Sequence, residues 1–216
     1  MKPQPEQAFI PVVDDELEQR ILWEIARQVR FLGEAPLVLD TPAGNGRHAR
    51  AMAALGAQVI AADAAQHRDL ICANAQTEGL NQRVDFAAWT FGNGAPPVGE
   101  RPYDFIFCHH SISLLPYAEA VTATRQLLKS LKIGGKLFIS AYGLHSALAD
   151  GYPGNTAIEE RFAPLPAATA KRYDIEGPVC LYSERDLVMF LIRTGAGILN
   201  TFTSTHGNVK GIAERL

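Results

Sequence analysis

The chain has 216 residues, of which 47% are hydrophobic and 20% charged, as in an ordinary globular protein of one domain. Its net charge is −3 and its Lys and Arg residues are scattered, which disfavours nucleic acid as a partner. Residues 1–18 lack the apolar core of a signal peptide, and no run approaches the roughly 18 apolar residues of a membrane span, so we expect no membrane partner.

The three cysteines, Cys72, Cys108 and Cys180, are odd in number, far apart and without a CxxC pair. This pattern predicts reduced thiols in a cytoplasmic protein rather than a disulfide framework or a zinc ribbon. The six histidines show no metal-ligand spacing, so we expect no metal site.

Residues 1–35 are predicted to form an extended tail followed by a helix that Asp14 or Asp15 could cap. The helix ends at Gly33. Its apolar residues recur at helical spacing: Leu17, Ile21, Leu22, Ile25, Val29 and Leu32.

Beyond this helix, short apolar runs alternate with helical patterns. Five strands are predicted, at 37–40, 58–63, 84–89, 104–109 and 134–141, and helices at 47–55, 67–78 and 116–131. Strict alternation of strand and helix predicts right-handed βαβ units and a parallel sheet that is covered on both faces.

Residues 142–181 interrupt the alternation with four prolines and no convincing period. A long irregular insertion in a compact domain is usually a lid or a binding loop, so we expect a substrate lid here. A capping box at Ser183 and Asp186 then opens a helix to Thr194. The chain ends in a predicted β-hairpin around Gly207 and Asn208.

The loop after the first strand carries the strongest functional signal. Asp40 closes a buried strand, and Gly44 and Gly46 would let backbone approach a ligand at the start of a helix. Asp63, at the end of the second strand, can accept hydrogen bonds from two ribose hydroxyls. These glycines also fit the relaxed dinucleotide fingerprint GxGxxG/A, which leaves a nicotinamide-dependent oxidoreductase as an alternative. Asp40 argues against it, because a carboxylate would meet nucleotide phosphates unfavourably.

Four segments together resemble class I S-adenosylmethionine-dependent methyltransferases of the small-molecule type, which include tellurite-resistance and thiol or amine branches. LDTPAGNGR resembles their first motif with proline in place of the first glycine, and VIAAD resembles the second. YDFIFCHHSISLLP resembles the fourth, and LKIGGKLFIS resembles the strand that follows it. The resemblance covers roughly residues 36–142.

This resemblance implies one Rossmann-like doubly wound domain over residues 1–216, with seven strands in the order 3-2-1-4-5-7-6. It also implies S-adenosylmethionine as cofactor and a small-molecule methyl acceptor as partner. It leaves the acceptor and the oligomeric state open. A non-catalytic S-adenosylmethionine-binding protein remains a second alternative.

The cofactor site that the resemblance implies has Asp40 and Gly44 at the methionine moiety and Asp63 at the ribose. Trp89 and Thr90 stand where the family often has an acid near the adenine. The full set of expected cofactor residues is Asp40, Pro42, Gly44, Asn45, Gly46, Asp63, Ala64, Trp89, Thr90, Cys108 and His109.

Methyl transfer from a sulfonium is an in-line displacement, and it needs a general base only if the acceptor must first lose a proton. We expect His109 and Tyr142 to be catalytic and His145 to be a further acceptor contact. Neighbouring residues of a strand point to opposite faces, so only one of His109 and His110 would face the cofactor if both were extended.

Overall fold

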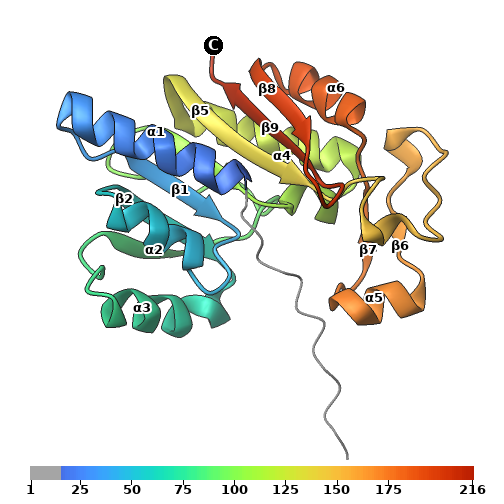
Figure 1. The fold of residues 1–216 in the computed structure, drawn as a ribbon, viewed down its shortest axis with the longest axis horizontal. Helices are drawn as coiled ribbons and strands as arrows, with labels where there is room; N and C mark the ends of the chain where they lie inside the picture. The colour runs from blue at the N-terminus through green and yellow to red at the C-terminus, as the bar shows by residue number, and fades with distance from the viewer. Residues whose placement is uncertain (1–15) are drawn as a thin grey trace, which may run out of the picture.

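The computed structural model describes residues 16–216, so the predicted caps Asp14 and Asp15 lie outside the described residues. A seven-stranded sheet forms the centre of the molecule (Figure 1). In spatial order its strands are β3 (Val84–Ala88), β2 (Gln58–Asp63), β1 (Leu37–Thr41), β4 (Tyr103–Cys108), β5 (Leu131–Ala141), β9 (Val209–Glu214) and β8 (Gly197–Thr203).

The first five strands are parallel, and β9 runs antiparallel to both of its neighbours. The predicted order 3-2-1-4-5-7-6 is confirmed, with β9 and β8 as the last two strands. The C-terminal β-hairpin is confirmed with them.

Helices cover both faces of the sheet. On one face lie α1 (Glu16–Leu32), α2 (Arg47–Ala54) and α3 (Arg68–Thr77), and on the other lie α4 (Tyr117–Ser130) and α6 (Glu184–Thr194). Within β1, Val38 packs against the first layer and Leu39 against the second. Burial on both faces explains why the strands are continuous apolar runs.

Most of the predicted apolar stripe of α1 faces the sheet. Leu17, Ile21 and Ile25 are buried in the core, and Leu22 and Val29 pack at its border. Leu32 is 65% exposed, so its predicted place in the stripe was wrong. Leu32 lies in the last turn of α1, beyond Ile25, the last buried residue of the helix.

Residues 142–181 are more ordered than the sequence pattern predicts. They contain two single 3₁₀ turns, the short helix α5 (Ala167–Tyr173), and a two-stranded sheet of β6 (Ala163–Pro164) and β7 (Pro178–Val179). They enclose a small hydrophobic core of their own: Leu148, Tyr152, Leu165, Val179 and Leu181. Each element is too short to show a period in the sequence, which is why the segment looked irregular.

The insertion is bounded by a close backbone approach at its start and by a capped helix after its end. The predicted capping box is confirmed, with the Ser183 hydroxyl accepting from the Asp186 amide and the Asp186 carboxylate accepting from the Ser183 amide. Gly143, just after β5, lies so near the hairpin turn that an added Cβ would stand 1.7 Å from the Gly207 carbonyl oxygen. Only glycine permits this approach, which fixes the start of the insertion against the hairpin.

Within residues 16–216, every helix is too short or too polar to cross a membrane. Cys72, Cys108 and Cys180 are all free thiols.

Candidate cofactor and acceptor site

The predicted site residues come from three strands that end at the same edge of the sheet. Asp40 lies near the end of β1, Asp63 ends β2, and His109 follows β4. The strand order reverses between β1 and β4, and open parallel sheets bind ligands at such a switch point, beyond the carboxyl ends of the strands.

Asp40 is fully buried, and neither of its carboxylate oxygens has a hydrogen-bond partner within residues 16–216. Burial raises its pKa to about 7, and the negative charges of Asp63 and Glu18 add to that rise. The charge of His48 and the nearby backbone amide of Ala49 oppose the rise. A buried carboxylate without a partner is unfavourable, so this position favours a cationic ligand.

The loop after β1 turns tightly through its glycines. Gly44 and Gly46 both have positive φ, of 58° and 76°, and Gly46 is the N-cap of α2. The Asn45 side chain accepts from the Arg47 amide at 3.1 Å, and Pro42 is exposed. The predicted loop conformation is therefore present, at the positive end of a helix dipole.

Asp63 is buried and already has several partners in the chain. One carboxylate oxygen accepts from the Gly44 amide at 2.6 Å. The other accepts from the Ala64 amide at 2.7 Å and lies 2.8 Å from Nδ1 of His67. A carboxylate offers about four acceptor positions, so these contacts leave room for a ligand hydroxyl. Its predicted contact with the ribose stays a prediction.

Trp89 and Thr90 begin the loop after β3. Trp89 is half-buried, its indole N–H donates to the Asn93 carbonyl at 3.0 Å, and its ring stands edge-on to Phe91. Thr90 is exposed. The indole is thus held by its own loop, and a contact with adenine stays a prediction.

His109 and His110 do not follow the strand alternation. His110 has a left-handed backbone, with φ of 58°, so the condition that both histidines are extended does not hold. Their rings stand edge to face with centroids 4.0 Å apart, and His109 also stacks on Phe107. The His110 amide donates to the Ser140 hydroxyl at 3.1 Å, which fixes the turn. Both imidazoles therefore lie together at the end of β4.

Tyr142, the residue after β5, completes this group. Its ring stacks on His110 with centroids 4.5 Å apart, and its amide donates to the Ser113 hydroxyl at 2.9 Å. Burial raises the pKa of the Tyr142 phenol, which keeps it protonated at neutral pH. His145 lies three residues further along the chain and is exposed.

The side chain of Cys108 is fully buried in the hydrophobic layer that includes α4. Burial raises its pKa to about 12, so the thiol is protonated at neutral pH. A protonated, buried thiol is a packing group rather than a nucleophile.

One cluster at the site carried no signal in the sequence. Glu18 of α1 binds Arg47 at 2.9 Å and Nδ1 of His48 at 2.9 Å, both at the start of α2. Burial alone would raise the pKa of Glu18, but the hydrogen bond and charge of His48 and the charge of Arg47 hold it below its ordinary value. The His48 ring lies 5.4 Å from that of His109, so the cluster reaches the end of β4.

The described residues contain no group of three His, Cys, Asp or Glu side chains that could hold a metal ion.

A family model described as a methyltransferase domain matches residues 38–135, which run from β1 into β5. No curated protein matches the sequence significantly.

Several solved structures have the same fold. SibL, an S-adenosylmethionine-dependent methyltransferase in its apo form, is 18% identical with a TM-score of 0.60, and the match covers 92% of this chain and 55% of SibL. The chain thus spans little more than half of that relative.

Two other matches include most of the relative's chain. An S-adenosylmethionine-dependent methyltransferase from Methanosarcina mazei is 20% identical, with a TM-score of 0.65 and coverage of 87% of this chain and 95% of that one. The 1,6-didemethyltoxoflavin-N1-methyltransferase of Burkholderia thailandensis, with 1,6-didemethyltoxoflavin and S-adenosylhomocysteine bound, is 17% identical, with a TM-score of 0.65 and coverage of 94% and 79%. At these identities the likeness shows the fold. The chain therefore has the fold of S-adenosylmethionine-dependent methyltransferases, and its residues 38–135 match the model of a methyltransferase domain.

Proposed function

We propose that the protein transfers the methyl group of S-adenosylmethionine to a small-molecule acceptor by in-line displacement. The observation that carries this proposal is Asp40, a fully buried carboxylate without a hydrogen-bond partner in residues 16–216, at the carboxyl end of β1. Its surroundings favour a ligand with positive charge, as the ammonium and sulfonium of this cofactor have, over the phosphates of a nicotinamide dinucleotide.

The cofactor residues of the proposal are those at the ends of β1, β2, β3 and β4. In it, Asp40 stabilises the cationic end of the cofactor, and Asp63 binds the ribose by accepting from a hydroxyl at its remaining acceptor position. The remaining contacts come from Cys108, the last residue of β4, and from the loops: Pro42, Gly44, Asn45, Gly46, Ala64, Trp89, Thr90 and His109. When bound, S-adenosylmethionine supplies a methyl carbon that is already activated by its positive sulfur.

The transfer residues of the proposal are His109 and Tyr142. An imidazole at the end of β4 can accept the proton of an acceptor that must ionise, and His109 is held against Phe107 and His110 for this task. The Tyr142 phenol stays neutral, so it serves as a hydrogen-bond donor and as a wall that excludes water rather than as a base.

The proposal treats residues 1–216 as one methyltransferase domain, with an N-terminal tail and helix in 1–35 and a substrate lid in 142–181. Free thiols at Cys72, Cys108 and Cys180 support work in a reducing compartment, the cytoplasm. The bound small molecule in the Burkholderia thailandensis structure supports a small-molecule acceptor over a nucleic acid.

The proposal is tested by incubating the protein with S-adenosylmethionine and a panel of thiols, amines, phenols and oxyanions. Release of S-adenosylhomocysteine and appearance of a methylated product are measured by mass spectrometry. Stoichiometric product with one acceptor class supports methyl transfer. If the protein binds S-adenosylmethionine tightly but forms no S-adenosylhomocysteine with any acceptor of the panel, a non-catalytic binding protein is favoured instead.

A further inference from the structure

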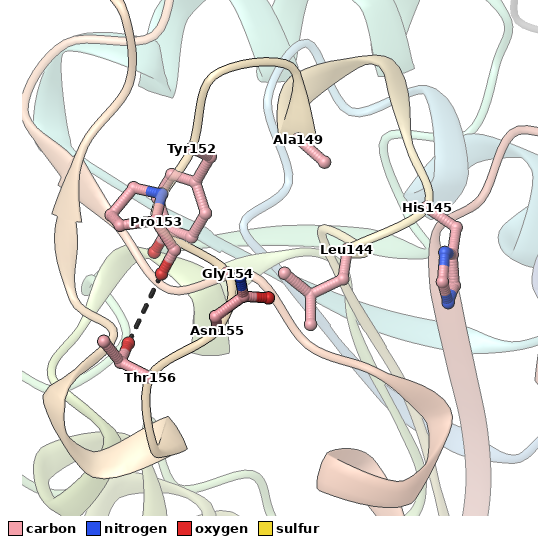
Figure 2. Close-up of a pocket in the computed structure, with 8 residues that line it drawn as sticks. All are labelled: Leu144, His145, Ala149, Tyr152, Pro153, Gly154, Asn155 and Thr156. Atoms are coloured by element: carbon pink, nitrogen blue, oxygen red, sulfur yellow. Dashed lines mark hydrogen bonds between the residues drawn. The ribbon is translucent and has the colours of Figure 1, made fainter.

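The insertion after β5 carries a cavity of about 540 Å³ that opens to solvent. Its walls come from two segments: Leu144, His145, Ala149, Tyr152, Pro153, Gly154, Asn155 and Thr156. Figure 2 shows the Leu144 side chain in the middle of the view, with Asn155 on one side and His145 on the other. Ligand pockets of small molecules typically measure roughly 300–1,000 Å³, so this cavity can hold one.

One wall is rigidly placed relative to the site at the sheet edge. The Tyr142 amide donates to the Ser113 hydroxyl at 2.9 Å, and the Gly143 amide donates to the Asn208 side chain at 3.2 Å. The Leu144 amide then donates to the Tyr182 carbonyl at 2.9 Å. Three successive residues are thus held by three different parts of the fold.

This wall also connects the cavity to the histidines. Tyr142, whose ring stacks on His110, stands two residues before Leu144. Residues 142–145 therefore run from the end of β4, where the proposal places the methyl transfer, to the lining of the cavity.

The opposite wall is held by the core of the insertion. Tyr152 is buried there, and its hydroxyl lies within hydrogen-bonding reach of the Arg161 and Val179 carbonyls. The Thr156 hydroxyl donates to the Pro153 carbonyl at 3.3 Å, as the dashed line in Figure 2 marks. An ordered wall on each side makes a preformed cavity rather than a gap between mobile loops.

The lining chemistry restricts the ligand. Among the described residues that form the cavity, none is Asp, Glu, Lys or Arg, so a charged ligand would find no side chain of opposite formal charge there, whereas an apolar ligand can cover apolar surface. Leu144, Ala149 and Pro153 supply apolar surface. The Asn155 amide and the His145 imidazole supply the hydrogen-bonding groups that would orient a ligand.

We infer that this cavity binds the methyl acceptor, and that the acceptor is an uncharged, largely apolar small molecule with a hydrogen-bonding group. That the ligand is the methyl acceptor rests on the proposed function. Binding of a ligand in the cavity can be measured whether or not the protein transfers methyl groups.

The test uses three two-ring probes of similar size and different charge: 2-naphthol, 2-naphthoate and 2-naphthylmethylammonium. Each is titrated into the ¹⁵N-labelled protein saturated with S-adenosylhomocysteine, and backbone amide shifts are followed by NMR. We expect saturable shifts at residues 144–156 with 2-naphthol, and at least tenfold weaker binding of the two charged probes.

A matched pair of variants locates the site. Ala149 and Ala147 lie in the same 3₁₀ turn, but only Ala149 lines the cavity. Ala149→Leu should weaken the binding of 2-naphthol at least tenfold, and Ala147→Leu should leave it unchanged.

The inference is overturned if 2-naphthol causes no saturable shift in this segment, if a charged probe binds as well, or if Ala149→Leu binds it like the wild type. Calorimetry with S-adenosylhomocysteine separates this outcome from failure of the proposed function. Both variants should bind S-adenosylhomocysteine like the wild type, whereas a wild-type protein that does not bind it would contradict the proposed function and leave the naphthol result standing by itself.

Discussion

The Asp63 carboxylate accepts a hydrogen bond from the Gly44 amide at 2.6 Å, so the end of β2 holds the loop after β1 in place. This contact joins two residues that were predicted separately as cofactor ligands. A change at Asp63 should therefore affect the loop as well as the ribose.

Asp63→Ala is expected to lower the affinity for S-adenosylhomocysteine at least about tenfold, because charge-assisted hydrogen bonds contribute about 1.5–3 kcal/mol each. Calorimetry measures the affinity, and circular dichroism checks the fold. Asp69→Ala is the control, since Asp69 is an exposed acid in the first turn of α3. Equal affinity in Asp63→Ala and wild type would contradict the predicted ribose contact.

Asp40 should make cofactor binding depend on pH. Its pKa in the ligand-free protein is raised to about 7, and a cationic ligand beside it would favour the ionised form. Affinity for S-adenosylhomocysteine should therefore rise from pH 6 to pH 8, with proton release near pH 7. Calorimetry in buffers of different ionisation enthalpy measures both, and Asp40→Asn should abolish the dependence and bind more weakly at pH 8.

The same carboxylate should reduce the stability of the ligand-free protein. The pKa of Asp40 is about 3.8 in the unfolded chain and about 7 in the folded protein. The neutral acid therefore stabilises the fold fully below pH 3.8, and this contribution is lost as the pH rises through about 7. Asp40→Asn should therefore raise the free energy of unfolding at pH 8 by up to a few kcal/mol, since one pKa unit corresponds to about 1.4 kcal/mol. Denaturation with urea at pH 5 and pH 8 would show this, and a less stable variant at pH 8 would contradict the assignment.

Glu18 should support both the fold and the cofactor loop, because it binds Arg47 and His48 at the start of α2. Glu18→Gln is expected to cost about 1–3 kcal/mol of stability and to weaken cofactor binding. Glu24→Gln is matched to it: Glu24 lies on the same helix and pairs with Lys136 and Arg27, without a contact to α2 in the described chain. Glu24→Gln should lower the stability of the protein and leave its affinity for the cofactor unchanged.

The stability contribution of Glu18 should also follow pH. Its folded pKa is lowered, so the contribution is present above the ordinary value of 4.5 and is lost as pH falls through the folded pKa. The difference in unfolding free energy between wild type and Glu18→Gln should shrink below pH 4.5. A difference that is constant from pH 7 to pH 3 would show that packing rather than charge holds α1.

Arg161 should hold the insertion to α6. It is buried, and it donates to the Asp186 carboxylate at 2.7 Å and to the Leu181 carbonyl at 2.9 Å. Arg161→Met removes both contacts and leaves Asp186 with only its Ser183 partners, and breaking such a buried pair costs about 3–5 kcal/mol. Hydrogen exchange should show lost protection in residues 148–166 while the sheet stays protected. Arg172→Met, at an exposed position, is the control. Equal hydrogen exchange in both variants would show that Arg161 does not hold the insertion to α6.

Much of the fold follows from local sequence patterns. The strands are buried on both faces, so they are continuous apolar runs that contrast with the amphipathic helices between them. The capping box at Ser183 and the hairpin turn at Gly207 act over a few residues, so both were predicted at their correct places.

The parts that were missed depend on long-range contacts or on unusual backbone. Glu18 and His48 are 30 residues apart, and no local pattern links them. His110 takes a left-handed conformation without being glycine, which the sequence does not indicate and which brings its ring beside that of His109. The core of the insertion joins Leu148 to Val179 across elements too short to show a period.

The proposed cofactor site is tested by calorimetric titration with S-adenosylhomocysteine and with NAD and NADP, because Asp40 should favour the ammonium group of the first over the phosphates of the other two. The account predicts micromolar binding of S-adenosylhomocysteine and no comparable binding of either dinucleotide. Tighter binding of NAD or NADP than of S-adenosylhomocysteine would contradict it.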